Sequence, residues 1–302
     1  MLFDFDADKY GIMDYVLIDK GWSGDKKYRA ATKDGESLLL RISDIDDYDR
    51  KKGEYGMLEK AAVLGINASR PIEFGLCNNG QSVFQLLSWI EGEDVEEILQ
   101  SLQSDKQYDL GTKVGQLLKA IHSLPGLECQ EPWGLRFRRK MQARVGEYNG
   151  SPIRCAGGDI AVKYLLDNQH WLDGRPQTFN HGDFNITNII AMPDGHVGVV
   201  DFNVYNGAYG DPWWEFDFAS WGNQPVVPYA TGLLHGYFDG RPPDEFFVML
   251  SYYMAYDALV ALCDTATGEQ GGEPEVGVRH MENVMGWYDD MRRVVPGWYG
   301  AV

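Results

Sequence analysis

The segment from His181 to Asn203 carries two carboxylates and a carboxamide at a spacing that suits phosphoryl transfer. Asn188 follows Asp183 by five residues and Asp201 follows it by eighteen, with short apolar runs around a Pro-Asp-Gly turn. This pattern predicts a loop and a two-stranded hairpin that brings Asn188 and Asp201 together, with Asp183 nearby. In phosphoryl transfer, an Asp accepts the proton of the acceptor hydroxyl, while an Asn and an Asp hold Mg²⁺ against the nucleotide phosphates. The alternative is a surface hairpin in which Asp and Asn serve only as turn residues.

The motif His-Gly-Asp-x-x-x-x-Asn, followed by an Asp after a strand, resembles the aminoglycoside phosphotransferase family of small-molecule kinases. A second motif of that family appears as Gly210-Asp211-Pro212. The resemblance extends from about residue 15 to about residue 295 and is specific only over 181–219. It implies an α+β, protein-kinase-like fold with a small strand-rich N-lobe and a larger helical C-lobe. It also implies that His181 holds the loop and that Asp211 supports the catalytic loop by hydrogen bonding.

Gly182 stands where protein kinases carry an Arg after the loop histidine. Without that guanidinium the loop cannot bind a phosphorylated activation segment. The interval from Asp201 to Gly210 is also short. We therefore expect an enzyme that is always active and has no phosphorylation switch.

The hydrophobic pattern changes from strand-like to helical near residue 91. Strands are expected over 15–18, 27–31, 37–42, 72–75 and 82–87, with one helix over 47–64. Helices are then expected over 95–102, 110–124 and 160–172, and loops over 145–158 and 266–277. We predict an N-lobe over 1–91 that binds the nucleotide, and a helical C-lobe over 92–302 that contains the catalytic hairpin and the acceptor site.

The composition is that of an ordinary globular chain, with 44% hydrophobic and 24% charged residues among 302. The N-terminus has neither a basic segment nor a sustained apolar core, and no uninterrupted apolar run approaches the length of a membrane span. The 4 cysteines are widely separated and lack metal-binding spacing, which indicates reduced thiols. These features predict a cytoplasmic protein without a membrane partner and leave its oligomeric state open.

The net charge of −18 argues against nucleic acid or an anionic membrane surface as a partner. Residues 1–91 carry 12 Lys and Arg against 16 Asp and Glu, a net charge of −4. Residues 92–302 carry 15 against 29, a net charge of −14. An acidic C-lobe would favour a cationic small-molecule acceptor. The alternative is that the acidic surface only aids solubility.

The nucleotide-binding residues are expected in the first ninety positions. Ser23 and Gly24 lie in a turn whose backbone N–H groups could cover the phosphates. Arg41 stands on the third strand where kinases carry the phosphate-binding Lys, and Arg can bind a phosphate in bidentate fashion. We expect Glu54 on the following helix to pair with Arg41, with Glu59 as the competing partner.

The segment 85–92 fits the linker between the lobes, where backbone groups near Ser88 and Ile90 would contact the adenine edge. The chain contains no Gly-x-x-x-x-Gly-Lys-[Ser/Thr] sequence, which excludes the phosphate loop of the other large class of nucleotide-binding enzymes.

Acidic residues of the C-lobe are the candidates to bind ammonium groups of an acceptor. The candidates are Glu215, Asp217, Asp257, Asp264, Glu273 and Glu275. We select Glu215, Asp217 and Asp257 as the acceptor-binding set. For each of them, a solvated or structural carboxylate remains the alternative.

These features together predict a Mg²⁺-dependent phosphotransferase that uses ATP or GTP and phosphorylates a hydroxyl of a small molecule. An aminoglycoside-like cationic acceptor is the leading hypothesis, and it would imply antibiotic resistance. The first alternative is a metabolic kinase for choline, homoserine, a sugar or a macrolide. The second is a pseudokinase that binds a ligand without turnover, which Arg41 favours and the intact Asp183, Asn188 and Asp201 oppose.

Overall fold

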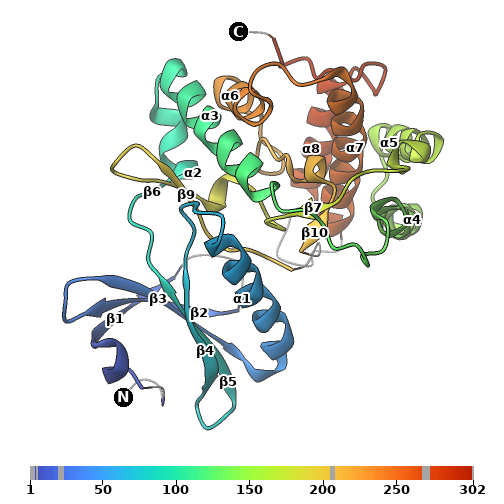
Figure 1. The fold of residues 1–302 in the computed structure, drawn as a ribbon. Coiled ribbons are helices and arrows are strands. Elements are labelled where there is room, and N and C mark those ends of the chain that lie inside the picture. The colour runs from blue at the N-terminus through green and yellow to red at the C-terminus, as the bar shows by residue number, and fades with distance from the viewer. Residues whose placement is uncertain (1–3, 5, 20–23, 205–207, 267–272, 301–302) are drawn as a thin grey trace. The chain divides into compact units, whose positions relative to one another are not determined.

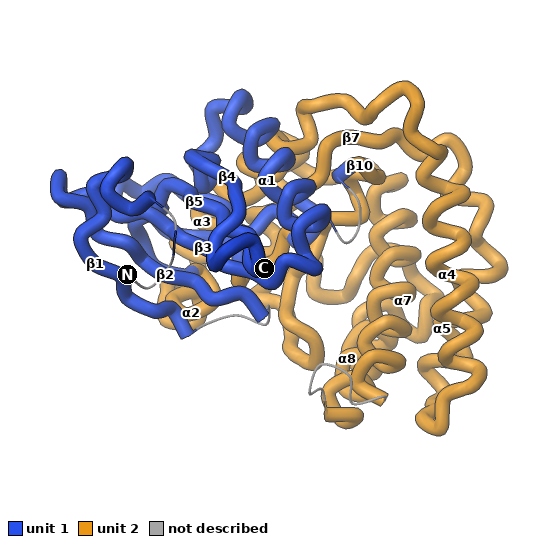
Figure 2. Tube along the Cα trace, turned by 90° about the horizontal axis from the view of Figure 1, so that it is seen from below, with its two compact units in different colours: residues 1–94, 181–183, 188–208 blue, residues 95–180, 184–187, 209–302 orange. Residues whose placement is uncertain are grey.

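The computed structural model describes residues 4, 6–19, 24–204, 208–266 and 273–300, which form two compact units (Figure 1). Unit 1 comprises residues 1–94, 181–183 and 188–208 (Figure 2, blue). Unit 2 comprises residues 95–180, 184–187 and 209–302 (Figure 2, orange). The lobe boundaries at 1–91 and 92–302 stay a prediction. Residues 188–208, which contain the predicted hairpin, belong to unit 1 together with the N-terminal residues.

Unit 1 contains an antiparallel sheet of five strands in the order β1-β2-β3-β5-β4. The strands are β1 (Ile12–Ile18), β2 (Lys26–Thr32), β3 (Ser37–Asp44), β4 (Pro71–Cys77) and β5 (Ser82–Ser88), and the helix is α1 (Tyr48–Ala62). Every strand and the helix expected here are confirmed. Alternate residues of β2 and β3, among them Tyr28, Ala30 and Leu40, are buried together because side chains along a strand alternate between its two faces.

A second, smaller sheet in unit 1 contains the predicted hairpin. It consists of β6 (Glu93–Asp94), β8 (Ile189–Ala191) and β9 (Val197–Val199) in the order β6-β8-β9. Ile189 pairs with Val199 in antiparallel register, which confirms the predicted hairpin. The backbone N–H of Val199 also donates to the carbonyl of Asn67, so the hairpin is bound to the segment that precedes β4.

Unit 2 is mainly helical. Its helices are α2 (Val95–Ile98), α3 (Ser104–Ile121), α4 (Trp133–Gly150), α5 (Ala156–Asp167), α6 (Val227–Phe238), α7 (Asp244–Ala266) and α8 (Pro274–Trp287). One short strand pair, β7 (Thr178–Phe179) with β10 (Tyr209–Gly210), accompanies them. α3 and α6 pack backbone to backbone because glycines lie at their contact: a Cβ on Gly115 would come within 2.0 Å of the Leu233 carbonyl oxygen.

The predicted loop over 145–158 is wrong at both ends. α4 continues to Gly150 and α5 begins at Ala156. Tertiary contacts override the helix-breaking glycines, because Tyr148 is fully buried and its hydroxyl donates to the carbonyl of Cys155 at 3.0 Å. The helix predicted over 160–172 is accordingly α5, which ends at Asp167, followed by a 3-10 turn over Gln169–Leu172.

By length and composition, α7 could cross a membrane, although its sequence contains no uninterrupted apolar run of that length. Asp257 and several tyrosines interrupt its apolar sequence. However, 83% of its most apolar window is buried inside the protein, as in the central helix of a globular core.

Candidate active site

His181 connects the loop before Asn188 to the chain that leaves β9. The ring is fully buried and lies 4.3 Å from the ring of Phe202. Its Nδ1 accepts from the backbone N–H of Asp183 at 3.3 Å, so Nε2 carries the proton and donates to the carbonyl of Val200 at 2.9 Å. These contacts agree with the predicted role of His181 in holding the loop.

Gly182 is required by the backbone of this loop. Its φ is +89°, and a Cβ at this position would lie 1.9 Å from the carbonyl oxygen of Asn203. Any side chain would therefore collide with the backbone of Asn203, two residues after Asp201. The loop geometry excludes an Arg here, independently of any role in regulation.

Asn188 orients the Asp183 carboxylate. The Asn188 Nδ2 donates to the Asp183 carbonyl at 2.9 Å and to its Oδ2 at 3.1 Å. Asn188 is 8% exposed, whereas Asp183 is exposed. The carbonyl of Asn188 accepts from the N–H of Val200 at 3.0 Å, which places Asn188 across the hairpin from the residue before Asp201. The site thus pairs an exposed, oriented carboxylate with a buried carboxamide.

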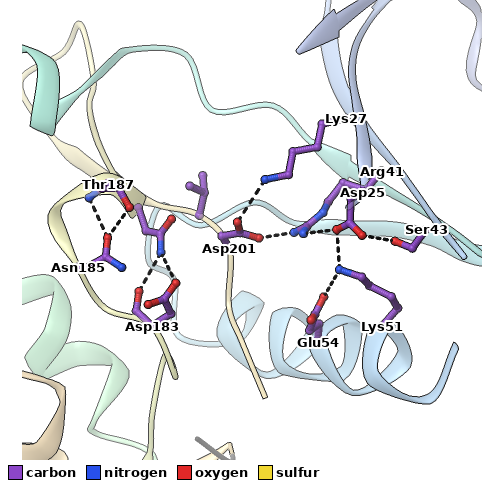
Figure 3. Close-up of polar contacts among 12 residues, drawn as sticks. Asp25, Lys27, Arg41, Ser43, Lys51, Glu54, Asp183, Asn185, Thr187 and Asp201 are labelled. Carbon is purple, nitrogen blue, oxygen red and sulfur yellow. Dashed lines mark hydrogen bonds and ion pairs between the residues drawn. The ribbon is translucent and has the colours of Figure 1, made fainter. Parts of the chain in front are cut away.

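Asp201 lies at a turn of the chain after β9 and has a φ of +66°, a left-handed conformation that Asp tolerates better than most residues. Its carboxylate forms an ion pair with Arg41 and a longer one with Lys27, at 3.5 Å from Nζ (Figure 3). Burial raises the pKa of Asp201, but Arg41 and Lys27 overcome this effect and lower it to about 2. Asp201 is therefore ionised at neutral pH.

Arg41 does not form the expected pair with Glu54. Its Nη2 donates to Asp25 Oδ2 at 2.7 Å, and its Nη1 donates to Asp201. Glu54 instead accepts from Lys51 Nζ at 3.0 Å, because Lys51 precedes it by three residues on α1 and shares its helix face.

Sequence reasoning missed Asp25 and Lys51. Lys51 is fully buried, and its Nζ lies 2.6 Å from Oδ2 of Asp25, whose side chain is 1% exposed. Burial would raise the pKa of Asp25, but Arg41 and Lys51 hold it well below its ordinary value. The available signals were the Lys51–Glu54 spacing on α1 and the acidic residue directly after Gly24.

Among the other predicted nucleotide-binding residues, Ser23 lies outside the described residues. Gly24 is exposed, and apart from its chain neighbours no heavy atom of the described residues lies within 4 Å of its Cβ position. Ser88 ends β5, and its N–H donates to the carbonyl of Arg70 at 2.9 Å. Ile90 packs on β9, because its Cγ2 lies 3.0 Å from the Cβ position of Gly198.

The three predicted acceptor-binding residues lie in unit 2 in different environments. Glu215 is buried and pairs with Nε2 of His122 at 2.9 Å, so its carboxylate already has a partner in the core. Asp257 is partly exposed and pairs with Nε2 of His280 at 2.8 Å. Asp217 is exposed and accepts from the N–H of Ala219.

Asp211 holds parts of unit 2 together. It is fully buried, and both of its carboxylate oxygens accept from Arg175, at 2.5 and 2.9 Å. Oδ2 also accepts from the Tyr253 hydroxyl at 2.6 Å, and Oδ1 from the N–H of Trp213 at 2.9 Å. Asp211 was predicted to support the catalytic loop by hydrogen bonding. Its side chain instead forms hydrogen bonds with Arg175 and with Tyr253 of α7.

The donor set of Asn188 and Asp201 fits Mg²⁺. The Asp201 carboxylate is ionised, and the side-chain hydrogen bonds of Asn188 use its Nδ2, which leaves its Oδ1 for another contact. Mg²⁺ prefers oxygen ligands and retains waters, so two protein oxygens are a sufficient protein contribution beside nucleotide phosphates. Elsewhere in the described part of the chain, no group of three or more His, Cys, Asp or Glu side chains could hold a metal ion.

The chain resembles known proteins both in sequence and in structure. The sequence model of the phosphotransferase enzyme family matches residues 14–247. A candidate aminoglycoside phosphotransferase from Ralstonia eutropha JMP134 is similar in structure, with a TM-score of 0.71 and 14% identity over 95% of this chain and 96% of the other. A choline/ethanolamine kinase family protein from Mesorhizobium loti has a TM-score of 0.62 and 16% identity over 92% and 91%.

A third structural neighbour is an aminoglycoside phosphotransferase from Streptomyces rimosus in complex with ADP and streptomycin. Its TM-score is 0.55, with 16% identity over 84% of this chain and 95% of the other. No curated protein matches the chain by sequence. At these identities the structural neighbours establish the fold, and they confirm the predicted kinase-like α+β class.

Proposed function

Because the chain belongs to the phosphotransferase enzyme family, we propose that it transfers the γ-phosphate of ATP or GTP to a hydroxyl group of a small molecule. The observation that carries this proposal is the arrangement of Asp183, Asn188 and Asp201 within one unit, with Arg41 and Lys27 on the Asp201 carboxylate. This arrangement provides the three kinds of group that phosphoryl transfer requires: an exposed base, oxygen ligands for a metal ion, and cations that can bind phosphate.

Asp183 acts as the general base in this proposal. Its exposed carboxylate can approach an acceptor hydroxyl, and the Asn188 amide holds it in one orientation. Positioned proton transfer of this kind contributes about 10²- to 10⁴-fold in rate. Because Nδ1 of His181 accepts a backbone hydrogen bond, the histidine does not compete for that role.

Asn188 and Asp201 would hold Mg²⁺, which neutralises phosphate charge and orients the nucleotide when it is bound. Arg41 and Lys27 reach Asp201 from the main sheet, and their guanidinium and ammonium groups can donate to phosphate oxygens. The remaining proposed nucleotide contacts are the turn at Ser23 and Gly24, the adenine-edge residues Ser88 and Ile90, and Glu54 as the partner of Lys51.

A cationic, hydroxylated small molecule is the proposed acceptor. Aminoglycosides, choline, ethanolamine and fructosamines, which the names of the structural neighbours mention, all combine an amine with a hydroxyl. The net charge of −14 over residues 92–302 favours such a molecule. Asp217 and Asp257 are the preferred acceptor ligands, because Glu215 is already paired with His122 in the core. We place the reaction in the cytoplasm, where both nucleotides are present.

A ligand-binding protein without turnover is the second candidate. The specific observation in its favour is that carboxylates of the chain itself already pair with Arg41 and Lys51. The exposed and oriented Asp183 favours the enzyme over this candidate.

A coupled nucleotide-turnover assay tests the proposal. Mg·ATP and Mg·GTP would be supplied with a panel of aminoglycosides, macrolides, choline, homoserine and simple sugars. We expect turnover with an amine-bearing acceptor and none without Mg²⁺. Activity only on a neutral sugar would refute the cationic acceptor, whereas nucleotide binding without turnover on any acceptor would favour the second candidate.

A further inference from the structure

A carboxylate from the chain itself fills a cluster of buried donors in unit 1 (Figure 3). Asp25 Oδ2 accepts from Arg41 Nη2 at 2.7 Å and from Lys51 Nζ at 2.6 Å. Asp25 Oδ1 accepts from Ser43 Oγ at 2.7 Å. Each of the three donor residues is at most 6% exposed, so the cluster forms a buried binding site for an anion.

Asp25 differs from its donors in how it is held. Arg41 and Ser43 belong to β3, and Lys51 belongs to α1, so the donors are fixed by a sheet and a helix. Asp25 lies before the start of β2 at Lys26 and outside any strand or helix. The carboxylate is therefore carried by a residue outside regular structure, whereas its three donors are held in a strand and a helix.

The Asp25 carboxylate uses the Arg41 guanidinium only in part. Nη2 donates to Asp25, but the buried Nε has no hydrogen-bond partner among the described residues. Nε and Nη2 together form the edge that two oxygens of one anion engage in a bidentate contact. Asp25 does not supply both, because its second oxygen accepts from Ser43 and forms no hydrogen bond with Nε. A phosphate has an additional oxygen and could satisfy Nε, Nη2 and Lys51 at once.

We propose that Arg41, Lys51 and Ser43 form the binding site for one phosphate of the nucleotide, and that Asp25 occupies this site until the nucleotide displaces it. That the ligand is a nucleotide rests on the proposed function, whereas the donor cluster stands on its own contacts. Arg41 and Lys51 also face Glu54 and Asp201. With Asp25 in place, three carboxylates face the two buried cations, and after its departure two carboxylates remain, so a phosphate is bound more strongly once Asp25 has left.

Calorimetric titration with ADP and with inorganic tripolyphosphate, both without Mg²⁺, tests this exchange. In Asp25→Asn the competing charge is absent, and we expect both ligands to bind about 10-fold more tightly than to the wild type. In Lys51→Gln we expect about 10-fold weaker binding. The matched controls are Asp34→Asn and Lys52→Gln, which change exposed residues of the same unit and should leave both affinities unchanged.

Unchanged or weaker binding by Asp25→Asn would overturn the proposal, because Asp25 would then be a permanent support for Arg41. If that variant does not fold, a crystal structure of the wild type with ADP decides: a phosphate on Arg41 and Lys51 with Asp25 displaced supports the exchange, and Asp25 still in place overturns it. Tighter binding by Asp25→Asn without phosphate transfer to any acceptor would retain this site and remove the proposed transferase. Phosphate transfer by the wild type together with weaker binding by Asp25→Asn would retain the proposed transferase and overturn the exchange of Asp25 for a phosphate.

Discussion

Each unit contains a buried carboxylate paired with an arginine, and the two pairs are built differently. In unit 2, both oxygens of Asp211 are engaged by the fork of Arg175, and Tyr253 and the Trp213 backbone complete the set. The Arg175 guanidinium also lies 4.1 Å from the centre of the Trp213 ring. In unit 1, Asp25 engages one nitrogen of Arg41, whose Nε has no partner among the described residues.

This difference separates a structural ion pair from one that can be exchanged. Asp211 joins Arg175 to α7, and every one of its hydrogen bonds would be lost if it moved. Asp25 lies outside regular structure and shares Arg41 with Asp201, the proposed metal ligand. A buried N–H group without a hydrogen-bond partner, such as Arg41 Nε, destabilises a folded protein, so its presence points to a functional role. We therefore expect the Asp25–Arg41 pair of unit 1 to take part in ligand binding, and the Asp211–Arg175 pair of unit 2 to stabilise the fold.

The largest expected effect concerns activity in unit 1. Asp183→Asn keeps the size of an exposed side chain but removes the proton acceptor, so phosphate transfer should fall about 10²- to 10⁴-fold. The unfolding temperature and the nucleotide affinity should stay close to those of the wild type. Steady-state kinetics with thermal unfolding checks this, and a variant with near-normal turnover would remove Asp183 from the catalytic role.

The second prediction concerns stability in unit 2. Asp211→Asn leaves the partly buried Arg175 without its charge partner, and the free energy of unfolding should fall by about 3–5 kcal/mol. Asp167→Asn is the matched control, because Asp167 pairs with Lys163 on the surface and such pairs contribute less than about 1 kcal/mol. Chemical denaturation measures both variants. Equal losses in the two would contradict a structural role for Asp211.

Two glycines extend the comparison to the backbone. Gly182 and Gly174 both have positive φ, but only at Gly182 would a Cβ meet another backbone atom, while Gly174 has open space. Gly174→Ala should therefore cost only the left-handed strain of about 1–2 kcal/mol. Gly182→Ala should cost a further 1–3 kcal/mol, roughly, and should displace the loop around Asp183. Denaturation curves for the pair test this, and a loss at Gly174 as large as at Gly182 would argue against the close contact with Asn203.

The smallest effect is a dependence of stability on pH. The folded pKa of Asp201 is about 2, below its ordinary value of 3.8, so its ionised form stabilises the native state above about pH 4. This contribution disappears as the pH falls through about 2. Because the side chain is one-third exposed, we expect only about 1 kcal/mol. Asp201→Asn should show a shallower loss of stability over this range, and identical pH profiles for variant and wild type would contradict the charge pairing.

The sequence was sufficient for features that depend on local patterns. The alternating strands of the main sheet and the hairpin that carries Asn188 follow from residue spacing and are present in the structure. The continuation of α4 to Gly150 was not predictable, because it depends on the burial of Tyr148 against residues later in the chain.

The charge cluster around Arg41 shows the same limit within the site. Glu54 on the following helix was the expected partner of Arg41, but Lys51 lies closer to Glu54 on the helix. Asp25 was overlooked because a single acidic residue in a turn has no pattern of its own. Only the folded sheet brings it within 2.7 Å of Arg41. Local periodicity is thus readable from the sequence, whereas the choice among several charged partners depends on three-dimensional packing.

The most direct test of phosphoryl transfer is to follow the γ-phosphate itself. The wild-type protein would be incubated with Mg²⁺, γ-labelled ATP or GTP, and the acceptor that gives the highest turnover, and the products would be separated and identified. We predict that the label is found on a hydroxyl of the acceptor and that the nucleotide is converted to its diphosphate. Label found only in inorganic phosphate, or retained on the nucleotide with every acceptor, would contradict the proposed reaction.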